Sequence, residues 1–442
     1  AGSLSIHADI LSTTGHVTLK AGTHLSLGAG VDVTTATGGT ISLNAEGGTL
    51  TMAPTARVVA TGSSARLAAF SNVTLGYVVA NAVSIVSLSG GIYGSGAVLN
   101  ISANQLRLQA SATIGTSSLH LFVDADEMTA LSYTSSVYIL ESNAVEVRTI
   151  SVTVTEVGAN GGLTDVTDSD QGSLTIGPGG NLIFTNVIGD LRVSNPLVAN
   201  GSGNILIEAP VGNVTIASTV SSTSGHITVR AAKGITLEST AQLSTGSPGT
   251  VALIAQDGSV TMATQALVQA ISSTVRIASS AAVVLGRVVT GTASVVAPGA
   301  LTSAGSSVVN VTANNLRIQT ASVGTYVQPL RTTVGRLSAL TSGSIFVSET
   351  DALEIGAVGA SVTQVFSNGT TSVITDAIQS DVQTTANGDI YLYAAGALSL
   401  NDGSDGDGIS AIAHGTGRIR LASGATVTVN ADVASTTGVV TV

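Results

Sequence analysis

The amino-acid sequence predicts an all-β fold, a right-handed parallel β-solenoid with three short strands in each turn of about 24 residues. Three observations predict this class: short runs that alternate aliphatic with Ser or Thr residues, aliphatic positions that return after a fixed interval, and a long internal repeat. A single turn cannot bury its own aliphatic face, so neighbouring turns must stack into a continuous core. No window sustains the i, i+3, i+4, i+7 spacing of an amphipathic helix.

The composition favours a core of aliphatic side chains. The 442 residues are 44% hydrophobic but only 3% aromatic, with 51 Gly and no Trp. A disordered chain would combine low hydrophobicity with high net charge, so we expect this chain to fold. The net charge of −11 is thinly spread and no Lys/Arg cluster occurs, which argues against nucleic acid or anionic lipid as a partner. The absence of Cys excludes disulfides and thiolate metal sites.

The sequence contains neither a recognisable signal peptide nor a long apolar segment. The chain starts at Ala1, without a charged segment followed by an apolar one, so we expect a processed product or an excised piece of a longer protein. No apolar run reaches the roughly 18 residues that a membrane-spanning helix needs. We therefore expect no membrane insertion.

The strands are marked by period-2 alternation and by regular spacing. Val17, Ile41 and Ala65 follow one another at intervals of 24 residues, and the same interval recurs two positions later. Gly-containing turns such as those at Gly28 and Gly38 separate the runs, because Gly adopts the positive φ of tight corners. At this period the chain would form about 18 turns.

A repeat of about 210 residues organises the whole chain. Residues 14–52 return at 224–262, and residues 8–15 return a second time at 431–438. The second return indicates that a third copy begins near the end of the sequence. We therefore divide one continuous solenoid, without independent domains, into copy 1 (1–210), copy 2 (211–422) and the start of a third copy (423–442).

The texture of the strands carries a family resemblance. Segments such as Gly39-Thr40-Ile41-Ser42-Leu43-Asn44-Ala45 and, in copy 1's last turn, Gly203-Asn204-Ile205-Leu206-Ile207-Glu208-Ala209 resemble the haemagglutinin-type repeats of large bacterial exoproteins related to filamentous haemagglutinin. The resemblance covers nearly the whole chain. It implies a β-solenoid shaft in a secreted adhesin or surface fibre, located outside the cell or on its surface.

One Asp-rich loop is the candidate metal site. Asp402, Asp405 and Asp407 alternate with Gly bends in the loop 401–408, and such carboxylates can wrap oxygen ligands around Ca²⁺. The loop lacks the Glu at the twelfth position that an EF-hand uses. Both a Ca²⁺ site and a solvated polar turn are therefore open interpretations.

A second acidic segment contains Asp165, Asp168 and Asp170. Matching the two copies by sequence pairs Asp165 with Asp376, and only two of the three carboxylates are kept in copy 2, at Asp376 and Asp381. We interpret the segment as a solvated loop.

A matched pair of carboxylates raises the question of catalysis. Glu141 and Glu146 recur in copy 2 as Glu349 and Glu354. A spacing of five places the two carboxylates on opposite faces of a strand or on either side of a corner, whereas glycoside hydrolysis needs two facing carboxyls. We interpret the pair as surface charge, and a carbohydrate-active β-helix enzyme is the alternative.

Two further residue types recur between the copies. His16 and His226 follow a Gly turn at the same point of each copy, and we expect them to be corner residues and not metal ligands. Arg107 and Arg317 alternate with aliphatic neighbours, which predicts that their side chains face solvent, where they could contact carbohydrate.

The sequence therefore predicts a structural or adhesive shaft segment that is not an enzyme and holds no cofactor apart from the candidate Ca²⁺ loop. The expected partners are neighbouring copies of the repeat, end to end, and a glycan or protein receptor on a host or other cell. A carbohydrate-binding rod and a calcium-gated interaction module are the remaining alternatives.

Overall fold

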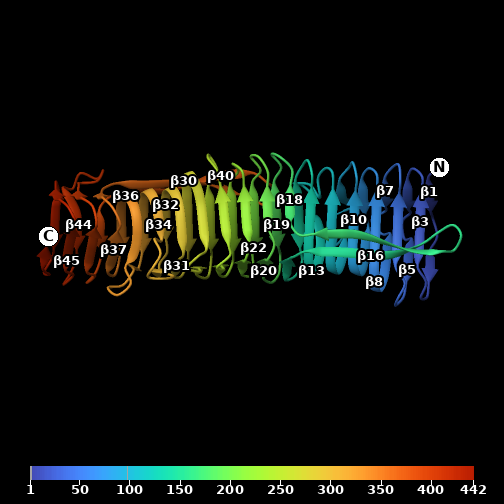
Figure 1. The fold of residues 1–442 in the computed structure, drawn as a ribbon, viewed down its shortest axis with the longest axis horizontal. Helices are drawn as coiled ribbons and strands as arrows, with labels where there is room; N and C mark the ends of the chain where they lie inside the picture. Colours follow the sequence, from blue (N-terminus) through green and yellow to red (C-terminus); the bar gives the residue numbers. More distant parts are fainter. Residues whose placement is uncertain (1, 97) are drawn as a thin grey trace. The chain divides into compact units, whose positions relative to one another are not determined.

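The computed structural model describes residues 2–96 and 98–442. Contacts divide the chain into two compact units: unit 1 is Ala1–Gly212 with Phe366–Thr370, and unit 2 is Asn213–Val365 with Thr371–Val442. Both units are parallel β-solenoids, with about 19 turns between them, strands stacked about 23 residues apart and no helix among the described residues (Figure 1). The predicted fold class is confirmed.

The strands of unit 1 are short apart from those at its middle. They are β1 (Leu4–Ile6), β2 (Ile10–Ser12), β3 (Val17–Ala21), β4 (Leu25–Leu27), β5 (Asp32–Thr35), β6 (Ile41–Ala45), β7 (Leu50–Met52), β8 (Arg57–Ala69), β9 (Val73–Leu75), β10 (Tyr77–Ser87), β11 (Ile92–Gly94), β12 (Ile101–Ala110), β13 (Leu121–Ser132), β14 (Val137–Glu141), β15 (Val145–Val147), β16 (Ile150–Val157), β17 (Leu163–Gln171), β18 (Leu174–Ile176), β19 (Leu182–Asn186), β20 (Leu191–Val193), β21 (Leu197–Ala199) and β22 (Ile205–Ala209).

The strands of unit 2 follow the same order of short and long. They are β23 (Val214–Ile216), β24 (Thr219–Ser222), β25 (Ile227–Ala231), β26 (Ile235–Leu237), β27 (Gln242–Thr245), β28 (Val251–Ala255), β29 (Val260–Met262), β30 (Leu267–Ser279), β31 (Val283–Leu285), β32 (Arg287–Val296), β33 (Ala300–Ser303), β34 (Val311–Thr320), β35 (Ser322–Val323), β36 (Leu330–Thr341), β37 (Ile345–Glu349), β38 (Leu353–Ile355), β39 (Val358–Val365), β40 (Thr371–Gln379), β41 (Val382–Thr384), β42 (Ile390–Ala394), β43 (Leu398–Leu400), β44 (Ile409–Ala413), β45 (Ile419–Ser423), β46 (Val427–Val429), β47 (Asp432–Ser435) and β48 (Val440–Thr441).

The register of the parallel strands follows the predicted spacing in the first turns and departs from it later. Val17 lies beside Ile41, and Ile41 beside Ala65, as the interval of 24 requires. Ala65 is then paired with Val83, so the next turn is shorter. The period is therefore set locally by the lengths of the corners.

The middle turns of each unit differ from the predicted three short strands. β8 runs for 13 residues and β30 also for 13, because two sides of the solenoid join into one bent strand. The bend coincides with a register shift and with backbone of positive φ, at Gly62 in unit 1 and at Ser272 in unit 2. These bends replace the Gly turns that separate short strands elsewhere.

Aliphatic side chains fill the interior, as the composition predicts. Leu25, Ile41 and Leu43 are fully buried, and the largest buried side chain is Phe184. Burying a Leu or Ile side chain contributes roughly 1.5–3 kcal/mol before entropy is counted. Since every turn adds several such residues, stacking of turns is the main source of stability. No helix that could cross a membrane was found in the part of the chain that the structure describes.

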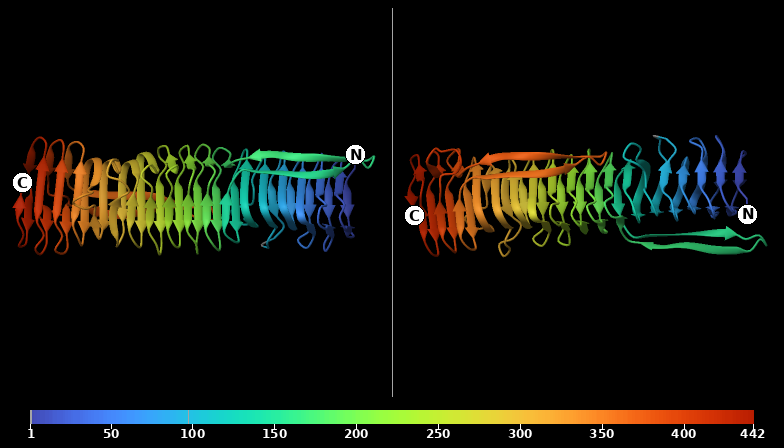
Figure 2. Two further views of the ribbon diagram at one scale, coloured as in Figure 1. Left: turned by 60° about the horizontal axis from the view of Figure 1, so that its bottom comes forward. Right: turned by 90° about the horizontal axis from the view of Figure 1, so that it is seen from above.

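Each unit carries an antiparallel hairpin that the sequence analysis did not predict. β16 pairs with β17, and β39 pairs with β40. β16 contacts the unit 1 strands β3, β6, β8, β10, β12 and β13, and β39 contacts the unit 2 strands β25, β28, β30, β32, β34 and β36. Figures 1 and 2 show the β16–β17 hairpin lying along the outside of its turns, with its loop reaching past the first of them. We call these two hairpins the straps.

Candidate functional site

The strap of unit 1 is held by a mostly buried ion pair. Asp168 on β17 accepts hydrogen bonds from Arg66 Nε at 2.9 Å and from Ser84 Oγ at 2.7 Å. The side chains of Arg66 and Asp168 are only 14% and 12% exposed. Removing one partner of such a pair leaves the other charge buried, which makes the contact a strong anchor.

Unit 2 repeats this anchor with the equivalent residues. Asp376 on β40 accepts from Arg276 Nε at 2.9 Å and from Ser294 Oγ at 2.8 Å. Burial alone would raise the pKa of Asp376, but its hydrogen bonds with Arg276 and Ser294 and the positive charges of Arg276 and Arg317 hold that pKa below its usual value. The carboxylate is therefore the favoured form at this contact.

Threonine hydroxyls of the solenoid hydrogen-bond to the backbone of each strap. Thr40 Oγ1 accepts from the Thr155 N–H at 2.9 Å and donates to the Thr155 carbonyl at 2.8 Å. Thr250 makes the same two bonds with Thr363, each at 3.1 Å. Backbone groups of β16 and of β39 are thus hydrogen-bonded to the solenoid turn beneath them. Backbone groups shielded from water need such partners.

The prediction that Arg107 and Arg317 face solvent is wrong. Their residues are 5% and 6% exposed, because the straps cover them. Arg107 Nε donates to the Ser169 carbonyl at 3.1 Å, and Arg317 Nε donates to the Ala377 carbonyl at 3.0 Å. Burial lowers the pKa of both guanidinium groups, and a strap Asp offsets part of this shift. These arginines hold the straps and are not available to carbohydrate.

The predicted acidic loop of copy 1 is part of strap strand β17. Asp168, and not Asp165, is the counterpart of Asp376, since the register places Asp168 opposite Val152 and Asp376 opposite Ala360. Asp165 is exposed and accepts from Thr155 Oγ1 at 2.7 Å. Matching by sequence alone paired the wrong residues, because the segment has too little aliphatic alternation to define its register.

The prediction of surface charge at Glu141 and Glu349 is also wrong. Glu141 is fully buried, and its Oε1 accepts from the backbone N–H of Ala125 at 3.0 Å and of Ser142 at 2.9 Å. Glu349, 1% exposed, accepts from Val334 N–H at 2.9 Å. Burial raises the pKa of Glu141 to about 8 and also raises that of Glu349, while the backbone donors act in the opposite direction.

The second member of each Glu pair makes ordinary ion pairs. Glu146 lies 3.6 Å from Arg192, and Glu354 lies 3.1 Å from Arg336. Since Glu141 points its carboxyl at backbone amides of a corner, the pair does not present two accessible carboxyls to a substrate.

The histidines lie at corners, as predicted. His16 Nδ1 accepts from the Thr40 N–H at 3.1 Å, and His226 Nδ1 accepts from the Thr250 N–H at 3.2 Å. Each ring therefore ties one corner to the next turn. Among residues 2–96 and 98–442, neither histidine belongs to a group of potential metal ligands.

The Asp-rich loop forms a carboxylate cluster with a residue from the turn before it. Single oxygens of Asp381, Asp405 and Asp407 all lie within 4.8 Å of one another. Asp381 is 6% exposed, has a positive φ of 65° and holds an Oδ1 without a hydrogen-bond partner. Burial, followed by the charges of Asp405, Asp407 and Asp402, raises the pKa of Asp381 to about 7.

The structure thus modifies the predicted ligand set. Asp405 and Asp407 come together, and Asp402 lies close enough to influence the cluster but is not one of the three. Asp381 was matched by sequence to the second acidic segment and was missed as a ligand, because residues 401–408 lengthen this turn and place Val382 beside Ala411. Several carboxylate oxygens converging on one point form the donor set that Ca²⁺ prefers.

Among the described residues of unit 1 there is no equivalent cluster. Residues 194–196 connect β20 and β21, whereas the longer segment 401–408 connects β43 and β44. Ser173, directly before β18, takes the place of Asp381, directly before β41. The cluster is therefore an addition to copy 2.

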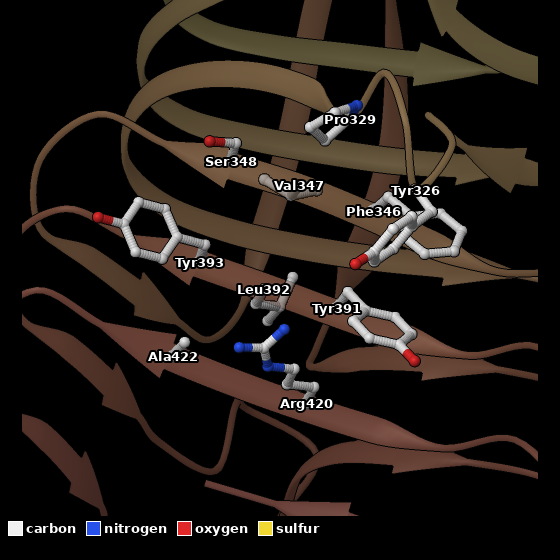
Figure 3. Close-up of a pocket in the computed structure, with 10 residues that line it drawn as sticks. All are labelled: Tyr326, Pro329, Phe346, Val347, Ser348, Tyr391, Leu392, Tyr393, Arg420 and Ala422. Atoms are coloured by element: carbon white, nitrogen blue, oxygen red, sulfur yellow. The ribbon is translucent and has the colours of Figure 1, made fainter.

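An open aromatic pocket lies on the surface of unit 2, with a volume of about 270 Å³. Figure 3 shows the rings of Tyr326, Phe346 and Tyr391 grouped on one side of it and Tyr393 on the other. Phe346 stacks on Tyr391 with ring centroids 5.2 Å apart, and Tyr326 meets both rings edge-on. Tyr326 is 73% exposed, which is unusual for an aromatic ring. We call this hollow the aromatic pocket.

In comparisons with known proteins, no family model, curated protein or solved structure matches the chain.

Proposed function

We propose that the chain is a structural and adhesive segment of an extracellular or cell-surface shaft, of the kind formed by haemagglutinin-type repeats, and that it does not act as an enzyme. Its proposed partners are neighbouring copies, end to end, and a glycan or protein receptor on another cell. The observation that carries the proposal is the strap anchored by Arg66 and Asp168 in copy 1 and by Arg276 and Asp376 in copy 2.

The straps suit a structural role because of how solenoids fail. Each turn of a solenoid contacts only its neighbours, so unfolding can start at any turn and spread. A strap that contacts six strands of its own unit, from β3 to β13, joins turns that otherwise never meet. Opening one turn then requires breaking contacts to several others, which favours resistance to fraying and force.

The residues that the copies share also support a structural role. Arg107, Glu141 and His16 and their counterparts bond to the protein's own backbone. Groups committed to internal backbone are not free to act on a substrate. The residues that recur in both copies are therefore residues that stabilise the fold.

Electron microscopy of proteins with different numbers of fused copies tests this proposal. Proteins containing one, two and three fused 210-residue copies should give particles whose length grows by a constant step, on the order of 45 Å per copy at about 4.8 Å per turn. Particles that collapse or vary in length would contradict it. Polysaccharide turnover that Glu141→Gln or Glu349→Gln abolished would show that the chain is an enzyme.

We further propose that the cluster of Asp381, Asp405 and Asp407 binds Ca²⁺. The observation that favours it is the buried Oδ1 of Asp381, which has no hydrogen-bond partner and lies among the other carboxylates. Uncompensated buried carboxylate is costly, and a cation with oxygen ligands would offset that cost.

Calorimetry with Ca²⁺ on the chelator-treated protein tests the cation site. We expect one site per chain and a rise in Tm when Ca²⁺ is added, both lost in Asp381→Asn and unchanged in Asp170→Asn, an exposed strap residue. Heat and Tm that do not respond to Ca²⁺ would eliminate the site. Mg²⁺ serves as the comparison cation, because its octahedral demand suits a cluster of protein carboxylates less well.

A further inference from the structure

The two straps end in the same five-residue turn. In residues 158–162 the Gly158 N–H donates to the Gly162 carbonyl at 2.8 Å, and in residues 366–370 the Phe366 N–H donates to the Thr370 carbonyl at 2.9 Å. Gly161 and Gly369 occupy the same place with φ of 79° and 80°. The two tips, which we call tip 1 (158–162) and tip 2 (366–370), therefore have one backbone shape.

Tip 2 is seated on the surface of unit 1, the unit to which it belongs by its contacts. The Gly369 carbonyl accepts from Asn181 Nδ2 at 3.4 Å. A Cβ at Gly369 would lie only 2.9 Å from the Tyr138 hydroxyl and 2.8 Å from Asn181 Nδ2. The ring of His120 hydrogen-bonds to the backbone of Ser367. The seat thus consists of His120, Tyr138 and Asn181.

Tip 1 has the same shape but no seat. Residues 158–162 are all exposed, and a Cβ at Gly161 would have nothing within 4 Å. Its backbone hydrogen bonds are satisfied within the turn, and Asn160 Oδ1 accepts from Gly162 N–H at 2.9 Å. Tip 1 is therefore a preformed and unoccupied copy of a structure that binds a surface elsewhere.

The aromatic pocket covers two of the three corresponding positions on unit 2; the third, Asp389 at the place of Asn181, is paired with Arg418. Phe346, the second residue of β37, stands where Tyr138 stands in β14, and Pro329, directly before β36, stands where His120 precedes β13. Tyr391, the second residue of β42, corresponds to Ile183 in β19. Ile183 is fully buried, whereas Tyr391 and Phe346 are partly exposed. The equivalent seat of unit 2 is thus open and lined by more aromatic surface.

The composition of tip 1 complements this pocket. Tip 2 begins with a ring, Phe366, and the unit 1 positions that correspond to Tyr391 and Tyr326 are Ile183 and Ser117. Tip 1 has Gly158 in place of Phe366, while unit 2 supplies Tyr391 and, at the position of Ser117, Tyr326. Tip 1 thus lacks the ring of tip 2, and the surface of unit 2 carries two rings, Tyr326 and Tyr391, at positions where unit 1 has none. A tip rich in Gly can approach flat rings closely because it has no Cβ there.

We propose that the aromatic pocket on unit 2 binds tip 1 of a second copy of this chain. The inference rests on the proposed structural role and gives end-to-end association a specific contact. One molecule contributes the pocket and the next contributes the tip, so the interface is heterologous and repeats along an open series. Tip 1 is part of unit 1 and the pocket is part of unit 2, so each molecule carries one tip 1 and one aromatic pocket for contact with its neighbours.

Disulfide trapping tests the contact, because the chain contains no Cys. Two single-cysteine proteins are mixed under mild oxidation: Ala159→Cys in tip 1 and Ser348→Cys in the pocket. We expect a mixed dimer to form at least tenfold faster than with the control pair Ala159→Cys and Gln256→Cys, where Gln256 is an exposed residue of unit 2. Adding Gly161→Arg to the tip should remove the advantage.

A trapping rate equal to that of the control pair would overturn the proposal. Binding of an oligosaccharide to the pocket, seen by loss on Tyr391→Ser, together with no trapping, would show that the pocket serves a glycan. Unchanged thermal unfolding of the Cys variants excludes misfolding. The constant length step of fused copies is measured on dilute single molecules, so it can hold when trapping fails, which separates this inference from the proposed function.

Discussion

Tyr138 in unit 1 is 8% exposed beneath a strap tip, whereas its counterpart Phe346 in unit 2 lines an open pocket. The solenoid beneath the two residues is the same: β14 pairs with β13 and β19, and β37 pairs with β36 and β42. The comparison shows that the core and straps can stay constant while the outer surface changes. Differences of function between copies are therefore expected on the surface alone.

A second difference lies at the corner before β44, where unit 2 holds the Asp381 cluster and unit 1 has a short connection. An insertion at a corner leaves the stacked strands in register, because the turn above still finds its partner: β41 pairs with β44 as β18 pairs with β21. Corners thus accept new chemistry at little structural cost. The following predictions test how far the two units are equivalent.

The largest effect is expected from the strap anchors. Asp168→Asn and Asp376→Asn should each leave a buried Arg without its partner and cost about 3–5 kcal/mol locally. Hydrogen exchange should show the β16–β17 hairpin released in the first variant and the β39–β40 hairpin in the second. Asp170→Asn, at an exposed position of β17, is the control and should change neither. Unequal losses in the two units would break the equivalence.

The buried Glu of each unit should make stability depend on pH. The folded-state pKa of Glu141 is raised from 4.5 to about 8 by burial, so its folded form prefers the proton. The stabilisation that the Glu141 carboxyl contributes to the folded state is fully present below pH 4.5. It is lost as the pH rises toward 8, because the carboxyl then gives up its proton in the folded state. The free energy involved is on the order of 5 kcal/mol at most.

Glu141→Gln should flatten this pH dependence in the turns around β14, measured by hydrogen exchange between pH 5 and pH 8. Glu349→Gln should act in the same direction around β37, where burial also raises the pKa. The exposed Glu46 provides the control substitution Glu46→Gln. An unchanged slope in Glu141→Gln would show that another group titrates.

An intermediate effect is expected at the two tips. Gly161→Ala and Gly369→Ala both place a Cβ on backbone of positive φ, which costs about 1 kcal/mol. Only Gly369→Ala adds contacts under 3.0 Å, with Tyr138 and Asn181. The second variant should therefore lose about 1–2 kcal/mol more. Equal losses, measured by urea unfolding, would mean that tip 2 is not seated in solution.

The smallest effect concerns the carboxylate cluster. With chelator present, Asp405→Asn should raise Tm slightly, because it removes repulsion between like charges. In Ca²⁺ the same variant should lower Tm relative to the unsubstituted protein, because it removes a ligand. The part of unit 1 that the structure describes has no such cluster, so the exchange rates of unit 1 serve as the internal control. A Tm change of one sign in both buffers would contradict a cation role.

The solenoid could be predicted from the sequence because its pattern repeats. Val17, Ile41 and Ala65 mark one inward position in three successive turns, and the structure pairs them. The straps could not be found in the same way, since β16 and β17 pair with each other, and bonds such as that from the Thr155 N–H to Thr40 Oγ1 join residues 115 apart in the sequence. The alternation from Ile150 to Val157 followed by Gly158 was the available signal for a hairpin.

The errors in side-chain placement have one cause. Arg107 and Glu141 were assigned to the surface because polar residues usually lie there. A strap covers Arg107, and a corner encloses the Glu141 carboxyl among backbone amides. Ser169 is 62 residues from Arg107, and Ala125 is 16 residues from Glu141, so the strand pattern does not reveal either contact. The 24-residue period does not reveal the cluster either, because residues 401–408 lengthen this turn and place Val382 beside Ala411.

Hydrogen exchange of the two strap tips in one sample tests most directly the claim that the copies share one strapped design and differ only in what covers it. The amides of β16 and β39 should be protected alike, while tip 2 at 366–370 exchanges slowly and tip 1 at 158–162 exchanges fast. Rapid exchange of β39 together with protection of β16, or equally fast exchange of both tips, would contradict the claim.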